Sequence, residues 1–361
     1  MKVKNLHLKN YRNYIDETFT YGDGLNIVCG KNAQGKTNSA EAIFMLCTGY
    51  SPRVKKDKQV IRYGEESAQI VAEAESNYGL VKVEMRFYQS ARKKILINEV
   101  PIAKIGELMG NINSVFFNPN ELKLIQESPE DRRRFMDVSL SQMNKRYFYA
   151  LKTYNEVLSH RNSLLKSEDR NLIIDTIRLW DEQLIESAIT IITERNNFIS
   201  KLAPYAKASH AELSDGEILT VEPIKEYGTT RDEIREFLKR SLIERLERDI
   251  ILGYTTIGPH RDDLKITLNG EDIKVYASQG QQRTAALSLK LSELEIFKDR
   301  FSEYPLLILD DALSELDITR QRRLLKKVEG IQTIVTCTNT PIEVFGGFDY
   351  KKILVEGGKI V

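Results

Sequence analysis

The 361-residue sequence has no excess of charge of either sign. Its 53 lysines and arginines almost balance its 52 aspartates and glutamates, which leaves a formal net charge of +1. A chain this close to neutral is neither a uniformly basic protein that coats nucleic acid nor an acidic disordered chain. Any charged partner must therefore meet a local patch of this protein.

The sequence is also poor in cysteine and lacks long hydrophobic runs. Its three cysteines, Cys29, Cys47 and Cys337, show no metal-ligand spacing, and an odd count without a signal peptide favours a reducing compartment. We therefore expect neither a disulfide nor a zinc site. No apolar run reaches the roughly 18 residues that span a bilayer, and charges interrupt the N-terminal segment too often for a secretory signal. The sequence thus predicts a cytoplasmic protein without a membrane partner.

The hydrophobic pattern changes twice along the chain. Up to about residue 125, short β-rich runs are separated by turns, with one helix predicted from Lys36 to Gly49. Between 126 and 250 the apolar spacing is mostly helical, and after Gly253 strand character returns. The predicted strands are 25–29, 68–74, 81–87, 94–97, 265–268 and 306–309, with further helices from about Gln281 and Thr319. We predict one α/β domain built from residues 1–125 and 251–361, with a mostly helical second domain inserted at 126–250.

A phosphate-binding motif occupies positions 30–37, which read GKNAQGKT and match G-x-x-x-x-G-K-[ST]. The motif requires a strand before the loop and a helix after it, and both are predicted here. Its glycines let backbone N–H groups turn toward phosphate oxygens, and the helix N-terminus adds partial positive charge. We expect Lys36 to reach the β- and γ-phosphates and Thr37 to bind Mg²⁺. The predicted ATP-binding residues of this loop are Gly30, Lys31, Asn32, Ala33, Gln34, Gly35, Lys36 and Thr37.

A second acidic element fits the same site. Positions 306–311 read LLILDD, four apolar residues and then two aspartates, as expected of a buried parallel strand that ends beside a phosphate. We expect Asp310 to hold Mg²⁺, and Asp311 to orient and deprotonate the attacking water. Lys36, Asp310 and Asp311 are therefore the predicted catalytic residues. The alternative is a core strand that ends in a solvated acidic turn.

Two further segments place the motif within the P-loop proteins. ASQGQQ at 277–282 and SELD at 314–317 flank the acidic strand in an order that resembles the ATP-binding-cassette superfamily. In that superfamily the signature of one subunit covers the γ-phosphate held by the P-loop of another. The resemblance implies a P-loop NTPase fold of the ATP-binding-cassette type and an ATP-dependent head-to-tail homodimer. The matching signature residues are Ser278, Gln279, Gly280 and Gln281, and the D-loop residues are Ser314 and Asp317.

Three departures from the superfamily pattern bear on the mechanism. Gln279 stands where a glycine is usual, and Asp311 stands where glutamate is commoner. Because the shorter carboxylate must lie nearer the water, we expect slow ATP hydrolysis. The segment TCTNT at 336–340 lacks the histidine of many relatives, so we expect Thr338 or Asn339 to sense the γ-phosphate.

The chain as a whole resembles the RecF family. The motifs that carry the resemblance are NYRNY at 10–14, GKNAQGKT at 30–37, SPEDRRRFMD at 128–137, RNSLLK at 161–166, GPHRDD at 258–263, SQGQQRT at 278–284 and LLILDDALSELD at 306–317. The resemblance implies a weak, DNA-stimulated ATPase related to structural-maintenance-of-chromosomes heads. Such proteins dimerise on duplex or gapped DNA, act with RecO and RecR to load RecA at gaps, and support replication restart and the SOS response.

The same resemblance implies roles for particular positions. It places Arg12 and Asn13 near the nucleotide. It leaves three readings open for residues 132–134, which join the two domains, contact phosphate, or form the solvated start of a helix. It favours a structural turn at His260 and Arg261 over a catalytic role.

DNA binding without sequence preference requires lysine and arginine side chains that meet phosphates. Residues 1–124 carry 18 basic and 13 acidic side chains, whereas the rest of the chain is slightly acidic. Two clusters there are the predicted DNA contacts: Arg53, Lys55, Lys56 and Lys58, and then Arg92, Lys93 and Lys94. A third basic cluster at 320–327 fits the solvated face of a helix.

Two other functions share the P-loop. A small-molecule kinase needs neither the signature nor SELD. The nucleotide-binding subunit of a transporter fits the ATPase motifs, but the long separation of Lys36 from Ser278 and the helical insertion disfavour it.

Overall fold

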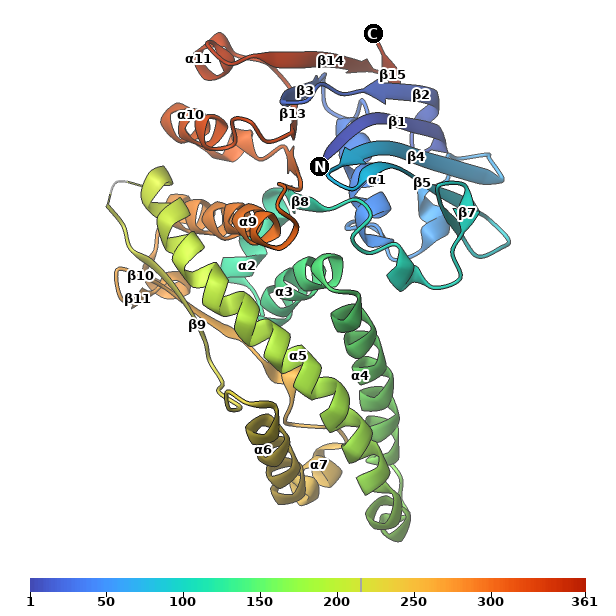
Figure 1. Ribbon diagram of the computed structural model, residues 1–361, viewed down its shortest axis with the longest axis vertical. Coiled ribbons are helices and arrows are strands. Elements are labelled where there is room, and N and C mark those ends of the chain that lie inside the picture. Colours follow the sequence, from blue (N-terminus) through green and yellow to red (C-terminus); the bar gives the residue numbers. More distant parts are fainter. Residues whose placement is uncertain (215) are drawn as a thin grey trace.

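The computed structural model describes residues 1–214 and 216–361 and contains three β-sheets with helices packed around them (Figure 1). The strands are β1 (Lys2–Tyr11), β2 (Tyr14–Thr20), β3 (Leu25–Cys29), β4 (Ser67–Ser76), β5 (Gly79–Tyr88), β6 (Lys94–Ile97), β7 (Val100–Pro101), β8 (Ser114–Phe117), β9 (Leu219–Pro223), β10 (Leu264–Leu268), β11 (Glu271–Asp272), β12 (Leu306–Asp310), β13 (Thr333–Cys337), β14 (Tyr350–Glu356) and β15 (Lys359–Ile360). The helices are α1 (Lys36–Thr48), α2 (Lys123–Gln126), α3 (Pro129–Met143), α4 (Lys145–Leu164), α5 (Arg170–Leu213), α6 (Arg231–Glu244), α7 (Leu246–Leu252), α8 (Ile273–Tyr276), α9 (Gln279–Phe301), α10 (Ile318–Lys327) and α11 (Ile342–Phe345).

The central sheet has the order β15-β14-β3-β13-β12-β8, and all its neighbours pair in parallel except β14 and β15. Both of its faces are covered. Along β12, Leu306 and Ile308 enter the core on the α1 side, while Leu307 and Leu309 enter the core on the α9 side. A parallel strand buried on both faces needs a continuous apolar run, which explains why β12 is the uninterrupted sequence LLIL before its aspartate.

The N-terminal sheet covers α1 on the side away from the central sheet. Its order is β2-β1-β4-β5-β6-β7, and every neighbouring pair is antiparallel. Along β4, Ala68, Ile70 and Ala72 point into the core that contains α1, while alternate residues face outward. The helix that carries the phosphate loop is thus held between two sheets.

The helical section forms an arm. Figure 1 shows α4 and α5 extending together away from the sheets, with α6 and α7 near the far end. With 44 residues, α5 is about 66 Å long, and its C-terminal part packs on α9 below the central sheet. The insertion also contains β9, which pairs with β10 in the third sheet, so the two predicted sections share one sheet here. The domain boundaries at 126 and 250 stay predictions.

Most of the predicted elements are confirmed. β3 and β6 match 25–29 and 94–97, the predictions for β4, β5, β10 and β12 fall inside those strands, and α1 ends one residue before Gly49. The predicted starts of α9 and α10 are late by two residues and one residue.

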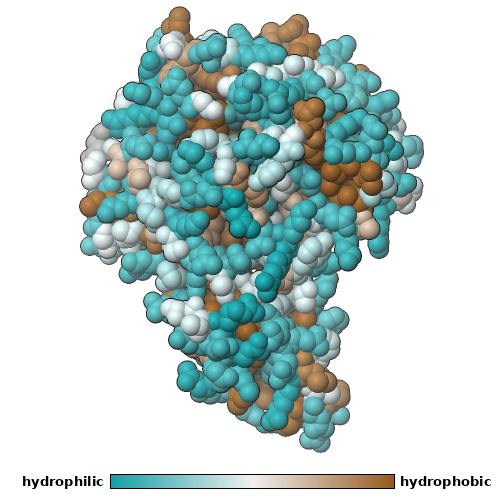
Figure 2. Space-filling view, viewed as in Figure 1, coloured by the Kyte–Doolittle hydropathy of each residue, from teal (hydrophilic) through white to brown (hydrophobic). Residues whose placement is uncertain are grey.

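The surface drawn in Figure 2 is mostly hydrophilic, with hydrophobic side chains gathered over the N-terminal sheet and near the end of the arm. Within residues 1–214 and 216–361, no helix combines the length and the apolarity needed to cross a membrane.

Candidate nucleotide-binding site

The phosphate loop connects β3 to α1 and approaches other parts of the chain closely at both motif glycines. A Cβ on Gly30 would lie 2.2 Å from the Val355 carbonyl oxygen, and one on Gly35 would lie 2.7 Å from Nδ2 of Asn13. Both glycines also have positive φ, at 155° and 119°. No side chain fits at either position, so this loop needs glycine at both ends of the motif.

Lys36 lies across the mouth of the loop. Its Nζ donates hydrogen bonds to the carbonyl oxygens of Gly30 at 2.6 Å and Lys31 at 2.8 Å, and the side chain is almost buried. The ammonium is therefore held at the loop at the first helical position, where the helix dipole also favours an anion.

Asp310 at the end of β12 faces the start of α1. Its Oδ1 accepts hydrogen bonds from Thr37 Oγ1 at 2.9 Å and Thr336 Oγ1 at 2.6 Å. Burial raises the pKa of this carboxyl group, and the two hydroxyl donors oppose the rise. Hydroxyl and carboxylate oxygens are ligands that Mg²⁺ prefers, so Thr37 and Asp310 fit the metal role predicted for them.

Thr336 links the two aspartates. Its hydroxyl donates to Asp310 and also accepts a hydrogen bond from the backbone N–H of Asp311 at 3.0 Å. Asp311 has φ of 54°, which turns its exposed side chain away from the line of the strand. The carboxylate predicted to prepare water is thus exposed beside the buried one predicted to hold metal. Thr338 and Asn339 follow β13 and are exposed.

The loop is supported from outside by the NYRNY segment and by the C-terminal turn. Asn13 Nδ2 donates to the Gln34 carbonyl oxygen at 2.7 Å, and Asn13 Oδ1 accepts from Asn38 on α1. The backbone N–H of Gly358 also donates to the Gln34 carbonyl oxygen, at 3.1 Å. Asn13 therefore reaches the phosphate loop from its backbone side, as a support.

Arg12 and Arg53 meet at a buried carboxylate on α1. Arg12 forms a two-pronged ion pair with Glu41, at 2.6 and 3.0 Å, and Glu41 is fully buried. Arg53 donates to Asn38 at 2.8 Å and lies 3.5 Å from Glu41. Asn38 lies in the first turn of α1, directly after the phosphate loop, so Arg53 lies beside this site, and its charge also lowers the pKa of Asp310.

The signature segment forms the N-terminus of α9. Ser278 is its N-cap and makes a reciprocal capping box with Gln281, whose side chain also donates to Glu217 at 2.7 Å. Ser278 and Gln279 are exposed. Among the hydrogen bonds and ion pairs of the described residues, none joins the signature to the phosphate loop of the same chain.

The D-loop lies beside the signature. Asp317 caps α10 and accepts from the Arg320 backbone N–H at 2.9 Å, and its carboxylate lies 3.3 Å from the Arg320 guanidinium. A Cβ on Gly280 would lie 3.5 Å from that same guanidinium. Ser314 Oγ donates to the Asp311 carbonyl oxygen at 2.8 Å, which ties the D-loop to the end of β12.

The basic clusters of the N-terminal sheet meet in one hollow of about 460 Å³. Lys56 and Lys58 line it from the first cluster, and Arg92 and Lys93 line it from the second. Lys93 is largely committed, because its Nζ donates to the Gly49 carbonyl oxygen at 2.6 Å and to Asp57 at 3.1 Å. Lys55 and Lys94 are exposed. We define the basic hollow as the surface formed by Lys56, Lys58, Arg92 and Lys93.

Two charged motifs that are distant in the sequence pair in the structure. Arg132 makes a two-pronged ion pair with Asp263, and Arg133 donates to the Asp262 carbonyl oxygen at 2.8 Å. His260 Nε2 donates to the Thr255 carbonyl oxygen at 3.0 Å, and its Nδ1 accepts from the Tyr154 hydroxyl at 2.6 Å. These contacts hold the turn between arm and sheets, which is the structural role predicted for His260.

Sequence reasoning missed three contributors to this site. Thr336 belongs to the TCTNT segment, which was considered only for a residue that replaces the histidine. Glu41 lies among the apolar residues of α1, and its position gave no sign of a buried ion pair. Gly358 belongs to a Gly-Gly pair near the C-terminus, and that pair was the available signal for a tight turn.

Comparisons with known proteins agree with this geometry. The family model described as the RecF/RecN/SMC N terminal domain matches residues 2–344. The DNA replication and repair protein RecF of Acetivibrio thermocellus is 41% identical over 366 residues, covering 99% of both chains. That of Alkaliphilus oremlandii is 43% identical over 344 residues, covering 94% of this chain and 93% of the relative.

Solved structures show the same relationship. A structure of the recombination mediator protein RecF with ATP superposes with a TM-score of 0.90 at 36% identity, covering 99% of this chain and 96% of that chain. An SMC head bound to the C-winged helix domain of ScpA shares the fold alone, with a TM-score of 0.60 at 15% identity, covering 100% of this chain and 97% of that one. The predicted ATP-binding-cassette fold is confirmed, and the chain belongs to the RecF family of DNA replication and repair proteins.

Proposed function

We propose that this protein is an ATP-dependent DNA-binding switch of recombinational repair, in which ATP joins two copies on duplex or gapped DNA and slow hydrolysis releases them. The observation that carries the proposal is the cluster of Thr37, Asp310 and Thr336 at the phosphate loop. The signature is exposed, and no described hydrogen bond or ion pair joins it to the phosphate loop of the same chain. A solved relative described with ATP supports the choice of nucleotide.

The phosphate loop is suited to hold the nucleotide. Backbone N–H groups of residues 30–37 and the ammonium of Lys36 would bind the β- and γ-phosphates. Thr37 and Asp310 would hold Mg²⁺, which when bound neutralises charge on the β- and γ-phosphates. Arg53 supplies a further positive charge near Asp310.

Hydrolysis would be the task of Asp311. Its carboxylate is exposed, and its backbone is fixed by Thr336, so it can accept a proton from a water positioned by the neighbouring chain's D-loop. Because the side chain of Asp311 is one carbon shorter than that of glutamate, it must lie nearer the water to reach it, which favours slow hydrolysis and a long-lived ATP-bound state.

Dimerisation follows from the position of the signature. Ser278 presents a hydroxyl and a helix N-terminus to solvent, and both favour an anion. A second copy, arranged head to tail, would supply the γ-phosphate to this surface. The two copies in such a dimer present every DNA contact twice. DNA affinity therefore rises through avidity when ATP binds.

The basic hollow is the proposed DNA contact, with Lys55 and Lys94 beside it. RecO and RecR are the proposed protein partners, because a solved relative is described as a recombination mediator in the RecFOR pathway. RecA is the protein that we propose they help to load at DNA gaps.

The DNA contact is tested by the double substitution Lys56→Glu and Lys58→Glu. With ATP and Mg²⁺, we expect DNA affinity to fall about tenfold or more. The slope of log affinity against log salt concentration should become shallower by about two, because each lost phosphate contact releases about one counterion fewer. Fluorescence anisotropy over a salt series measures both.

The matched control is Lys207→Glu with Lys239→Glu, which changes net charge equally at exposed positions on the arm. ATP binding should be unchanged in both double variants. Equal DNA affinity for the two double variants would contradict the proposal that the basic hollow contacts DNA.

A further inference from the structure

The side chain of Gln281 ties the signature to a residue that lies outside the sequence motifs. Its Oε1 accepts a hydrogen bond from the Ser278 backbone N–H at 2.7 Å, and its Nε2 donates to Glu217 Oε1 at 2.7 Å. The sequence pattern places Gln281 among the residues that meet a second copy. In the structure, its amide is already used at both ends within the same chain.

Glu217 lies in the segment between α5 and β9, and its side chain is 20% exposed. Its Oε2 lies 3.1 Å from Nε2 of His210, a fully buried residue in the last turn of α5. Because a carboxylate only accepts, this nitrogen donates. The other ring nitrogen of His210 lies 3.2 Å from Ser288 Oγ, farther along α9. The carboxylate of Glu217 therefore bridges the end of α5 and the signature.

The backbone next to Glu217 is also held. The Ile218 N–H donates to Asn269 Oδ1 at 2.9 Å, and the Asn269 N–H donates back to the Ile218 carbonyl oxygen at 2.8 Å. Asn269 lies in the turn between β10 and β11. Because its neighbour is paired in this way, Glu217 needs little further ordering to hold Gln281.

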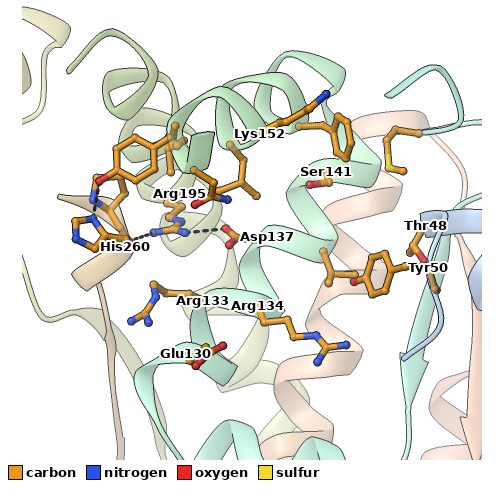
Figure 3. Close-up of a pocket in the computed structure, with 18 of the residues that line it drawn as sticks. Thr48, Tyr50, Glu130, Arg133, Arg134, Asp137, Ser141, Lys152, Arg195 and His260 are labelled. Atoms are coloured by element: carbon orange, nitrogen blue, oxygen red, sulfur yellow. Dashed lines mark hydrogen bonds and ion pairs between the residues drawn. The ribbon is translucent and has the colours of Figure 1, made fainter. Parts of the chain in front are cut away.

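The helix that carries His210 is anchored at the arm junction. Arg195 on α5 is buried and pairs with Asp137 at 2.8 Å and with Asp262 at 2.9 Å, and Figure 3 shows the pair with Asp137. His210 follows Arg195 along the same helix, at a distance of about 22 Å. Glu217 thus joins the signature to a helix that buried ion pairs hold in place.

The bridge bears on how well the signature is prepared for a partner. N–H groups at a helix N-terminus need a capping partner, and the capping box supplies one only while the Gln281 side chain keeps one rotamer. The contact with Glu217 fixes that rotamer. Without it, the first turn of α9 would have to be ordered when a second copy binds, at a cost in affinity.

We propose that Glu217 is a positioning residue for the signature, and that Gln281 transmits its effect to Ser278 and does not itself bind the nucleotide of a second copy. This proposal rests on the ATP-dependent dimerisation proposed above. The exposed hydroxyl and helix N-terminus at Ser278 meet the phosphate of the second copy. Glu217 and Gln281 stay within their own chain and hold that surface in one geometry.

The test exchanges the two side chains in the Asp311→Asn protein and measures ATP-dependent dimer affinity by sedimentation. Gln281→Glu keeps the capping box, because glutamate is a usual residue at this position of the box. It also places a second carboxylate against Glu217, so dimer affinity should fall about tenfold or more. Adding Glu217→Gln should restore the affinity to within about threefold of the Asp311→Asn protein. The amide then donates to the new carboxylate and still accepts from His210.

Two single substitutions of Glu217 separate its contacts from its charge. Glu217→Ala removes the bridge and should weaken the dimer about as much as Gln281→Glu does. Glu217→Gln alone should be mild, because its amide oxygen accepts from Gln281. His210 can then accept at Nε2 and donate from Nδ1 to Ser288.

The matched controls are Glu222→Ala on β9 and Gln183→Glu on α5, both at exposed positions. Each repeats one of the substitutions away from the signature and should dimerise within about twofold of the Asp311→Asn protein. Circular dichroism and the ATP affinity of the dilute monomers show that every variant is folded with an intact phosphate loop.

A double exchange that stays as weak as Gln281→Glu alone would overturn the proposal, because Gln281 would then contact the second copy directly. Unchanged dimer affinity in Glu217→Ala would overturn it as well. Both results leave ATP-dependent dimerisation standing. If the Asp311→Asn protein itself forms no dimer with ATP, the proposed function fails, and the role of Glu217 fails with it.

Discussion

Asp310 is a carboxylate that the fold keeps almost out of water, with only two hydroxyl donors on its Oδ1. Burial favours its protonated form, and Thr37 and Thr336 favour its ionised form. A metal ligand must be ionised, so the threonines support binding of Mg²⁺ at physiological pH.

Thr336→Val removes one of these donors with little change in shape. The pKa of Asp310 should rise further, because less remains to oppose the effect of burial. The acidic limb of the ATPase pH profile should then move toward higher pH, with the rate at pH 6 falling about threefold or more relative to pH 8. Thr333→Val on the same strand is the control, because its hydroxyl bonds to the Ile331 carbonyl oxygen and not to Asp310. Identical pH profiles for the two variants would contradict the role of Thr336.

His260 makes the stability of the arm junction depend on pH. Burial lowers its pKa to about 4, from an ordinary value of 6.5. Between these pH values His260 is protonated in the unfolded chain but not in the folded chain. The free energy of unfolding therefore decreases as the pH falls from 6.5 toward 4. At pH 4.5, relative to pH 7, this group should cost on the order of 2 kcal/mol of unfolding free energy.

Urea unfolding at pH 7 and pH 4.5 measures that cost. His260→Gln cannot take up the proton, so its unfolding free energy should change less between the two pH values. The exposed His160 provides the control, and His160→Gln should keep the pH dependence of the unaltered protein. A His260→Gln protein with an unchanged pH dependence would contradict the assignment.

At the scale of elements, the sequence predicted those whose own residues carry a clear apolar pattern. β12 is apolar throughout because both faces of the central sheet are covered, and α1 begins at a motif whose chemistry requires a helix. β9 was not predicted because its alternation of buried and less buried residues covers only five positions inside a helical section, and its pairing with β10 is a tertiary contact. β1 was not predicted because the register shift between Val3 and Asn5 breaks the regular spacing of its core residues.

The C-terminal turn between β14 and β15 offers a test of how the phosphate loop is supported. Gly357 and Gly358 both have positive φ, at 55° and 76°. A Cβ on Gly358 would lie 2.4 Å from the Asn13 carbonyl oxygen, whereas one on Gly357 would meet nothing within 4 Å. Gly358→Ala should therefore push Asn13 off the loop and lower ATP affinity by about tenfold, which equals 1.4 kcal/mol.

Gly357→Ala is the matched control, because it brings similar backbone strain without the close approach. Its ATP affinity, measured by equilibrium dialysis or calorimetry, should stay within about threefold of the unaltered protein. Equal losses in the two alanine variants would show that turn strain, and not contact with Asn13, controls the loop.

At the scale of the whole molecule, the sequence predicted the motifs but not which of their residues lie side by side in the folded chain. Arg53 was grouped with Lys55, Lys56 and Lys58 as a DNA contact by closeness in sequence. In the structure it also donates to Asn38 on α1, and its DNA contact stays a prediction. Lys58 and Lys93 belong to separate clusters, and the fold brings both to one hollow. Such meetings depend on tertiary packing, which local patterns do not encode.

The molecule also carries the two parts of the proposed site on separate elements. The phosphate loop connects β3 to α1, whereas the signature begins α9, which packs on α5 and β8. We therefore expect one chain to supply half of each proposed ATP site and a second copy to complete it.

The most direct test is the mass of the Asp311→Asn variant, measured by sedimentation with ATP and Mg²⁺. The amide keeps the size of the side chain but cannot take a proton from water, so ATP should persist and hold two chains together. We predict a species of twice the monomer mass that retains duplex DNA, and a return to monomer when Ser278→Arg is added on the signature surface. An Asp311→Asn protein that stays monomeric at saturating ATP would contradict the account.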